Sequence, residues 1–528
     1  MSSATTAATG TGSPQRPAVG TSRLTRALAW AAAIGIGSSI LIMIVASAVR
    51  HSAAVPLMPW PPGWPPLELA GHLPVAATYA ALWAAVILGG GGVIAGLAAV
   101  ARGARFPARL LIAACFVVVA AFAVLPPAGS TDTLNYATFG RIAVLGHNPY
   151  VMTPTQLYRT GDPIGKLAPL IWHKHGTLYG PLATAEQRTA AELGGTSPAR
   201  IIFWLKLWNA IVFLGVVIGL DRMLRSDPAR RARGHLLWSL NPLVLWGLVA
   251  SGHLDAFAAA AGFFGLALIR TRRAGPDPEP PPGAEPRRLG PEPLVALAAG
   301  VLVGVAADFM LTYLLLAAAL AWALRRWPAA LLSAAAGLAV AVVPAYLWAG
   351  RPLIHSLLLR RGKVSADNFY QLFSAAYRHP LPPSVDLAVV LVFGALALLL
   401  LWRLPDVAPD LPVLQPALAI GIAWLFVWYY QLPWYDVMII ALLALYSASR
   451  LDYVVIVQLT AGSLVMMPGG SGNEPPLGWL RTVSHEIWFT WAPLVLLGCV
   501  VAVIALCLTG AWNFGPRAEI GRPVRTGA

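Results

Sequence analysis

The chain consists mainly of long apolar segments separated by short polar ones. A run of about 20 apolar residues is long enough to cross a bilayer as a helix. By this criterion the pattern predicts about fourteen transmembrane helices, at residues 27–48, 73–100, 109–126, 199–220, 235–251, 256–270, 293–309, 310–324, 328–350, 386–403, 414–432, 434–449, 452–468 and 486–509. The fold class that we expect is therefore all-α, a polytopic transmembrane helical bundle.

The composition agrees with a membrane domain. Of the 528 residues, 58% are hydrophobic and 11% are charged, whereas a soluble globular domain carries about 25% charged residues. A soluble fold of this size would lack the polar residues needed to cover its surface. The net charge of +15 does not indicate a nucleic-acid partner, because the basic residues lie in short clusters between apolar segments, as the positive-inside rule expects.

The basic clusters also predict the orientation of the chain. Arginines gather in the loops that follow every second apolar segment, for example at 222–233 and 270–273. Because basic short loops mark the cytoplasmic side, we expect both termini in the cytoplasm. The predicted organisation is a disordered cytoplasmic tail at 1–23, a transmembrane domain at 24–510 with a Pro-rich cytoplasmic linker at 274–293, and a basic cytoplasmic tail at 511–528.

The longest outer loop, 127–198, contains the first candidate catalytic residue. Asp132 follows directly after an apolar segment, at the expected membrane boundary. A carboxylate there is partly desolvated, which increases its basicity, and it could deprotonate a hydroxyl group of an acceptor. The alternative is a helix cap, since Ser130, Thr131 and Asp132 all have capping side chains.

Two further polar groups face the same predicted side. His253 and Asp255 lie between two apolar segments, where they either bind a phosphate or sugar hydroxyls or form a solvated turn. Arg360, Arg361 and Lys363 are cations on the outer side, against the usual charge bias. An anionic head group or a phosphate explains them, and simple solvation in a long loop is the alternative.

Aromatic residues form the last candidate feature. The stretch 428–436 contains Trp434, Tyr435 and three other aromatic residues. Such a density is typical of an interfacial belt, and it can also line a groove for a sugar or a prenyl chain. The three cysteines, Cys115, Cys499 and Cys507, lie in apolar segments and form no pattern for a disulfide framework or a zinc site. Nothing in the sequence requires a metal or another cofactor.

Four motifs in a fixed order resemble those of the polyprenol-phosphate-mannose-dependent alpha-1,6-mannosyltransferases of actinobacterial lipomannan assembly. These enzymes belong to the GT-C glycosyltransferase superfamily. The motifs are Asp132 followed by Tyr136, Gly140, Arg141 and Leu145-Gly146-His147-Asn148-Pro149-Tyr150; Tyr179-Gly180-Pro181-Leu182; Leu240-Asn241-Pro242 followed by Gly252-His253-Leu254-Asp255; and Pro433-Trp434-Tyr435. The resemblance extends over most of residues 120–440.

The resemblance implies a GT-C bundle in the plasma membrane with its active site on the extracytoplasmic face. It implies that Asp132 is the general base of an inverting transfer from a polyprenyl-phosphate sugar, most simply mannose, to a cell-envelope glycolipid or polysaccharide. The donor phosphate and sugar would be bound by Arg141, His253, Asp255, Arg360, Arg361 and Lys363. The substrate groove would contain Tyr136, Tyr179, Trp434 and Tyr435. The expected partners are this donor, this acceptor and membrane lipids, without nucleic acid.

Two positions depart from the family pattern. Leu254 stands where the family has Asn, and Asp308 stands where related sequences have a basic residue. An acid near a phosphate would repel it, so Asp308 either points elsewhere or marks a different donor or acceptor. The alternative functions are a transporter or flippase of lipid-linked glycans and a non-catalytic membrane protein of envelope assembly. Transporters typically contain inverted repeats, and this sequence has no visible repeat.

Overall fold

The computed structural model describes residues 22–56, 65–273, 288–358, 362–373, 381–467 and 478–513. These residues form an all-α fold, as the sequence predicts. In this part of the chain, strands occur only as two short pairs: β1 (Val49–His51) with β2 (Leu69–His72), and β3 (Arg272–Arg273) with β4 (Arg288–Leu289).

Six helical segments of the described chain are long and apolar enough to cross a membrane, which indicates a membrane protein. They are α1 (Arg23–Ala48), α2 (Val75–Ala101), α7 (Pro198–Leu224), α13 (Pro328–Leu358), α14 (Pro383–Arg403) and the continuous segment of α18 (Gly478–Glu486), η7 (Ile487–Trp491) and α19 (Ala492–Thr509). A seventh candidate is broken, with a bend of 118° between its two halves. It comprises α8 (Pro228–Gly234), η2 (His235–Ser239), α9 (Pro242–Val244), η3 (Leu245–Ala250) and α10 (Asp255–Leu268).

The other apolar helices are shorter. They are α3 (Ala108–Val124), α11 (Pro293–Phe309), η4 (Leu311–Tyr313) with α12 (Leu314–Leu324), α15 (Leu414–Val427), and η6 (Pro433–Asp436) with α16 (Val437–Leu445). A further helix, α17 (Arg450–Met466), lies in the segment predicted at 452–468. All of them coincide with predicted apolar segments. A straight crossing needs about 20 residues, so the number of membrane crossings stays a prediction.

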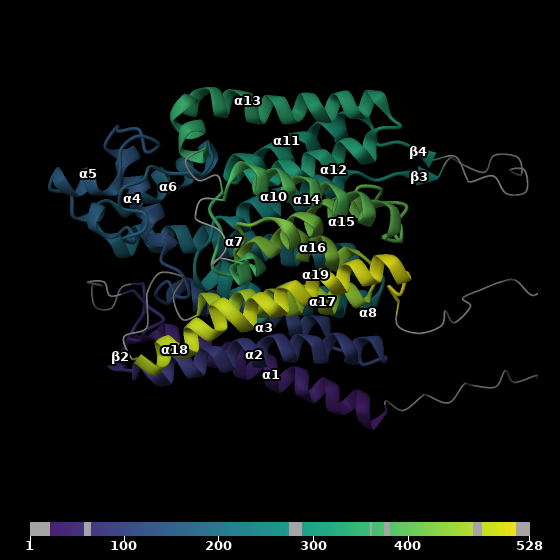
Figure 1. The fold of residues 1–528 in the computed structure, drawn as a ribbon, viewed down its shortest axis with the longest axis horizontal. Coiled ribbons are helices and arrows are strands. Elements are labelled where there is room, and N and C mark those ends of the chain that lie inside the picture. The colour runs from purple at the N-terminus through teal and green to yellow at the C-terminus, as the bar shows by residue number, and fades with distance from the viewer. Residues whose placement is uncertain are drawn as a thin grey trace, which may run out of the picture.

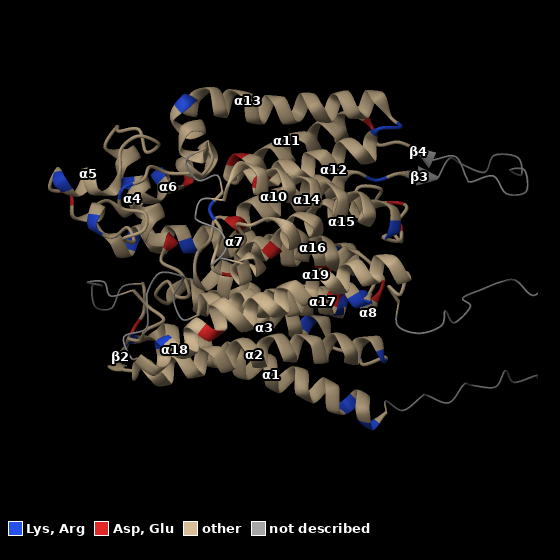
Figure 2. Cartoon of the chain, in the orientation of Figure 1, with Lys and Arg blue, Asp and Glu red and all other residues tan. Residues whose placement is uncertain are grey.

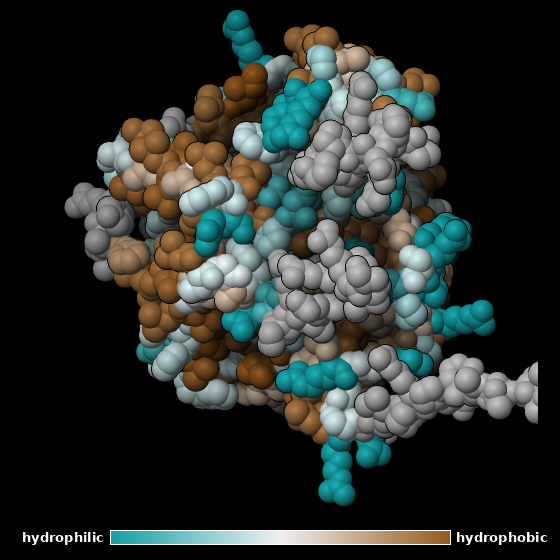
Figure 3. All heavy atoms as spheres, turned by 90° about the vertical axis from the view of Figure 1, so that its right-hand side faces the viewer, coloured by the Kyte–Doolittle hydropathy of each residue, from teal (hydrophilic) through white to brown (hydrophobic). Residues whose placement is uncertain are grey.

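The helices of the long loop after α3 lie together at one end of the bundle (Figure 1). They are α4 (Asp132–Val144), α5 (Pro154–Arg159), η1 (Pro163–Lys166) and α6 (Pro181–Gly194). The start of α1 and the end of α19 lie at the opposite end (Figure 1). Charged residues gather at these two ends, and the middle of the bundle contains few of them (Figure 2). On the face of the bundle where α1 begins, hydrophilic residues are spread across the surface, and hydrophobic residues lie beside them (Figure 3).

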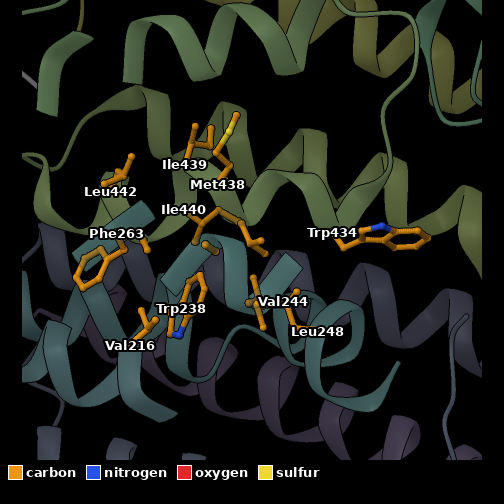
Figure 4. Packing of buried hydrophobic residues seen from close by; sticks show 14 of the residues in the cluster. Val216, Trp238, Val244, Leu248, Phe263, Trp434, Met438, Ile439, Ile440 and Leu442 are labelled. Atoms are coloured by element: carbon orange, nitrogen blue, oxygen red, sulfur yellow. The ribbon is translucent and has the colours of Figure 1, made fainter. Parts of the chain in front are cut away.

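The core of the bundle lies where α7, η2, α10 and α16 meet. The rings of Phe213 and Trp238 stack with their centroids 5.2 Å apart, and Figure 4 shows Trp238 in this region together with Val216, Phe263 and Ile440. Every residue of α16 is buried. A helix that is apolar on all sides is expected in the interior of a large bundle, and α16 occupies that position.

Glycines allow two pairs of helices to pack closely. A Cβ at Gly35 of α1 would lie 2.7 Å from the carbonyl oxygen of Leu88 in α2. A Cβ at Gly300 of α11 would lie 2.0 Å from the carbonyl oxygen of Ala334 in α13. Small residues at such contacts are typical of helices that associate in membranes, where close backbone approach replaces the hydrophobic driving force.

The last part of α13 bends at Gly350. This residue has φ +65° and ψ −162°, a conformation that glycine adopts without strain. The helix therefore changes direction here, and its final turns fold toward the bundle (Figure 1). This bend brings Leu357 and Leu358 to the cavity described below.

Several predictions fall on residues that the structure does not describe. The N-terminal tail up to residue 21, the linker residues 274–287 and the C-terminal tail from residue 514 lie outside the described residues. Arg360 and Arg361 lie outside them as well. The described chain shows that α1 already begins at Arg23, within the predicted tail.

Candidate active site

Asp132 is the first residue of α4 and borders a cavity. The preceding residue, Thr131, is the N-cap, and its side chain makes no capping hydrogen bond. The Ser130 hydroxyl oxygen instead accepts a hydrogen bond of 3.1 Å from the amide of Asp132. Asp132 occupies the first helical position after the N-cap, and its side chain is 15% exposed and borders the cavity. A negative charge at this helix N-terminus is stabilised by the helix dipole.

The segment before Asp132 is held in place by two polar side chains from other helices. Lys206 of α7 is buried and donates hydrogen bonds of 2.6 Å and 3.1 Å to the carbonyl oxygens of Leu125 and Pro126. The Ser251 hydroxyl donates a bond of 2.8 Å to the carbonyl oxygen of Ala128. These contacts connect the start of α4 with α7 and with the break in the bent span. The sequence analysis did not single out Lys206, which is one cation in a long apolar helix.

The bent span changes direction at residues 251–254. Gly252 has φ +70°, and a Cβ there would lie 3.1 Å from Cγ of Lys206, so the turn favours glycine for both reasons. The turn carries His253 into the interior, where it is fully buried, and α10 then begins with the buried Asp255. The alternative of a solvated turn is therefore wrong for His253 and Asp255.

His253 contacts three candidate residues. Its Nδ1 lies 3.8 Å from Oδ2 of Asp132 and 3.3 Å from the hydroxyl oxygen of Tyr136. Its ring stacks on Trp434 with a centroid distance of 3.8 Å. His253 lies in the turn between two helical segments, and burial lowers its pKa to about 3. The imidazole is therefore neutral at physiological pH, so its contact with Asp132 is not an ion pair there.

The four candidate aromatic residues lie at two depths. Tyr179 and Tyr435 line the cavity. Tyr136 and Trp434 lie behind them, since Tyr136 hydrogen-bonds the Tyr179 hydroxyl at 3.1 Å and Trp434 packs on His253. Burial, followed by the charge of Asp132, raises the pKa of Tyr179 well above its usual value. The Tyr179 phenol therefore stays protonated and can donate a hydrogen bond.

The cavity has a volume of about 530 Å³ and is lined by several elements that lie far apart in sequence. The lining residues come from the start of α4, the loop before α6, η4, the bent end of α13, the start of α14 and the aromatic segment after α15. They are Asp132, Trp172, Leu178, Tyr179, Met310, Leu311, Thr312, Leu357, Leu358, Lys363, Asp386, Val390, Trp428, Tyr429, Tyr430, Leu432 and Tyr435. The wall is mainly apolar and aromatic, which suits a substrate with a hydrocarbon part.

Among the described lining residues, Lys363 is the basic one and Asp132 and Asp386 are the acidic ones. The Lys363 ammonium lies 5.5 Å from the centroid of the Trp172 ring, within the range of a cation–π contact. The structure thus brings Lys363 and Asp132 to one cavity. Asp386 lies in the first turn of α14 and was not predicted from the sequence. An acidic residue in the first turn of a helix is common, because it interacts favourably with the helix dipole, and so it does not by itself indicate a site.

Three other residues lie outside the cavity lining. Nε of Arg141 pairs with Oδ2 of Asp162 at 2.7 Å, so Arg141 holds the loop between α5 and η1. Asp255 is 1% exposed, and its Oδ1 has no hydrogen-bond partner among the described residues. Asp308 is buried near the end of α11, and a Cβ at Gly180 would lie 2.0 Å from its carbonyl oxygen. The Asp308 backbone therefore packs against the Tyr179–Leu182 motif, and Asp308 is not among the residues that line the cavity.

In the part of the chain that the structure describes, no group of three or more His, Cys, Asp or Glu residues could hold a metal ion. The expectation that the reaction needs no metal stays a prediction.

Comparison with known proteins identifies the family. Residues 32–326, more than half of the chain, match the model of the family described as alpha-(1->6)-mannopyranosyltransferase, N-terminal domain. The matched range includes Asp132, Tyr179 and His253 and ends before Lys363. No curated protein and no solved structure matches the chain. The match confirms the resemblance seen in the motifs, and the chain therefore belongs to the alpha-(1->6)-mannopyranosyltransferase family.

Proposed function

We propose that the protein transfers mannose from a polyprenyl-phosphate donor to a cell-envelope glycolipid or polysaccharide, with inversion at the anomeric carbon. Membership of the family supports a mannosyltransferase activity. The observation that carries the proposal is the cavity itself, where a carboxylate, Asp132, and an ammonium group, Lys363, share a wall that is otherwise mainly apolar and aromatic. This combination suits a substrate that has a sugar, a phosphate and a hydrocarbon chain.

In the proposed reaction Asp132 acts as general base. It removes the proton of the acceptor hydroxyl as the acceptor oxygen attacks the anomeric carbon. The bond between this carbon and the phosphate oxygen breaks, and its electron pair leaves with the polyprenyl phosphate. The attack comes from the face opposite to the leaving group, so a beta-linked donor gives an alpha product.

Lys363 receives the leaving group in this scheme. A polyprenyl phosphate leaves as a stable anion, so it needs a positive charge and no proton donor. An ammonium group in an apolar cavity interacts strongly with such an anion, because little water screens the charge. The neutral His253 supplies no positive charge there, and its contacts with Tyr136 and Trp434 suit a role in holding the cavity wall.

We propose that the cavity opens to the extracytoplasmic side. The helices α4 to α6 extend from the end of the bundle opposite to the start of α1 (Figure 1). The short basic loops, such as 222–233, favour a cytoplasmic position for the α1 end. A donor carried by a lipid in the membrane would then reach Asp132 from the outer half of the bilayer.

The substitution Asp132→Asn tests the assignment of the base. It keeps the side-chain shape and removes the basic group, so transfer should fall by about 10²–10⁴-fold, the usual contribution of a general base. The assay follows radioactive mannose from polyprenyl-phosphate mannose into the lipid and glycan fractions of membranes, with polyprenyl-phosphate arabinose as a parallel donor.

Glu192→Gln is the matched control, because Glu192 is an exposed carboxylate of α6 paired with Arg188. This variant should transfer mannose at the wild-type rate. A wild-type rate in Asp132→Asn, with normal insertion into the membrane, would exclude Asp132 as the base. Transfer of arabinose in preference to mannose would overturn the donor assignment.

A further inference from the structure

A second group of polar side chains is buried beside the cavity. It consists of Asp367, Gln431, Asp436 and Gln458, each at most 6% exposed. Asp367, Gln431 and Gln458 line a separate small cavity of about 20 Å³. Asp436 joins this group through a hydrogen bond of 3.4 Å from Nε2 of Gln458 to its Oδ1. A cavity of about 10–15 Å³ holds one water molecule, so this one holds a single small species.

The group contains more acceptors than donors. Oδ1 of Asp367, Oδ2 of Asp436, and Oε1 of Gln431 and Gln458 have no hydrogen-bond partner among the described residues. The side-chain nitrogen of Gln431, Nε2, donates a hydrogen bond of 2.9 Å to the carbonyl oxygen of Trp424. This bond fixes the orientation of the side-chain amide and therefore the position of Oε1. Buried polar atoms are almost always satisfied, so four oxygens without a partner in one place require an explanation.

A water molecule does not satisfy this group. It donates two hydrogen bonds, and four acceptors are present, two of them on carboxylates. A cation interacts favourably with carboxylate and amide oxygens and offsets the negative charges.

We infer that Asp367, Asp436, Gln431 and Gln458 form a binding site for Ca²⁺. The free atoms are all oxygens, the ligands that hard cations prefer, and two carboxylates balance a divalent charge. Ca²⁺ accepts about six to eight oxygens in flexible geometry, and two carboxylates that bind through both oxygens with two amides supply about six. Mg²⁺ usually retains several waters, for which the small cavity has no room.

The ion would connect two segments that form the wall of the proposed active site. Asp367 lies in the same loop as Lys363, and Asp436 directly follows Tyr435 in η6. This loop and the aromatic segment already contact each other, because the backbone N–H of Gln431 donates a hydrogen bond of 2.9 Å to the Ser365 hydroxyl oxygen. Asp367 and Asp436 are therefore positioning residues for Lys363 and Tyr435. That consequence rests on the proposed function, whereas the binding of Ca²⁺ does not.

The test measures Ca²⁺ binding in the absence of any donor. The purified full-length protein is treated with a chelator, and its Tm is recorded as Ca²⁺ is added, with Mg²⁺ as the comparison ion. We expect a saturable rise of several degrees with Ca²⁺ and a smaller one with Mg²⁺. Equilibrium binding of radioactive calcium should show one saturable class of sites.

Asp367→Asn and Asp436→Asn should lose both the rise in Tm and the bound calcium. Gln458→Met removes one neutral oxygen, keeps the side-chain length and should weaken Ca²⁺ binding about tenfold without preventing folding, since a single neutral hydrogen-bonding partner contributes about 1.4 kcal/mol. Glu192→Gln and Asp132→Asn should bind calcium as the wild type does, so the result is independent of the proposed catalysis.

Three outcomes would overturn the inference. The first is the absence of any Ca²⁺-dependent change in the chelator-treated wild type. The second is an unchanged response in Gln458→Met together with Asp367→Asn. The third is an Asp367→Asn variant that is more stable than the chelated wild type while calcium has no effect on either, because the carboxyl group then holds a proton.

Discussion

The two ends of the bundle bury charged groups in opposite ways. At the end where α1 begins, Arg233 of α8 and Asp452 of α17 are each 2% exposed and form a bidentate pair, with N–O distances of 2.6 Å and 2.7 Å. The remaining guanidinium hydrogens point to carbonyl oxygens, at 2.8 Å for Tyr446 and 2.9 Å for Leu443. This network is closed, and its charges are paired within the protein.

At the other end some buried polar atoms have no partner among the described residues. Asp132 borders a cavity 3.8 Å from a neutral His253. Nε2 of His253 and Oδ1 of Asp255 have no hydrogen-bond partner in the part of the chain that the structure describes. Leaving such groups unpaired costs about 1–3 kcal/mol each. The comparison indicates that the paired network around Arg233 and Asp452 stabilises the fold. The polar groups around His253 and Asp255 are instead arranged around a ligand.

The largest effect on stability is expected at the closed end. Arg233→Ala leaves Asp452 as an unpaired buried charge, which should lower the free energy of unfolding by about 3–5 kcal/mol. The apparent Tm in detergent and the yield of folded protein measure this loss. The double variant Arg233→Met/Asp452→Leu removes both charges and should recover most of the stability.

Activity per folded molecule should stay at the wild-type level in the double variant. A loss of turnover in that variant, with Tm restored, would mean that the closed network also serves catalysis and would remove the contrast between the two ends.

The open end should respond in activity rather than in stability. Lys363→Met removes the positive charge of the cavity, and kcat/KM for the polyprenyl-phosphate donor should fall about 100-fold, the effect of losing one group that stabilises a developing anion. Tm should change little. Lys166→Met, an exposed lysine of η1, is the matched control. Equal kinetics in the two variants would exclude Lys363 as the partner of the leaving phosphate.

A smaller effect is expected from the titration of His253. Its pKa is about 3 in the folded protein and 6.5 in an exposed chain. The contribution of the neutral imidazole to the free energy of unfolding is therefore fully present above pH 6.5 and is lost as the pH falls toward 3. The loss is about 1.4 kcal/mol for each pH unit, or about 2 kcal/mol at pH 5. His253→Gln should lose less stability between pH 7.5 and pH 5 than the wild type does.

His147→Gln, at an exposed histidine of the same outer loop as Asp132, is the control for the loss of a histidine as such. Apparent Tm values at the two pH values measure the difference. Parallel curves for His253→Gln and the wild type would show that the imidazole is not held neutral, and the open end would then contain a cation next to Asp132.

Much of the fold follows from local patterns in the sequence. The predicted helix at 73–100 is observed as Val75–Ala101, and the one at 199–220 as Pro198–Leu224. These segments are apolar over their whole length, so the membrane leaves the backbone no alternative to a helix. The short segment predicted at 235–251 is less regular and contains π-helical turns around Asn241-Pro242. Proline removes a backbone donor there, and neighbouring helices determine how the chain continues.

The candidate site was predictable only in part. Asp132, His253 and Lys363 stand out because ionisable residues next to apolar segments are costly and therefore informative. Arg141 pairs with Asp162 and does not line the cavity, so its contact with the donor stays a prediction. Asp386 and Trp172 line the cavity through contacts between distant segments. The same holds for Gln431 and Gln458, which are unremarkable in sequence and become informative once their amide oxygens are seen to be buried together.

The sequence by itself determined that this chain is an all-α membrane protein with mannosyltransferase motifs, because hydrophobic length and motif order are properties of contiguous residues. Only the tertiary structure decided which polar side chains share a cavity and which are closed off in ion pairs. The physical reason is that the cost of a buried charge depends on the atoms around it, and these come from helices separated by up to hundreds of residues, such as Arg233 and Asp452.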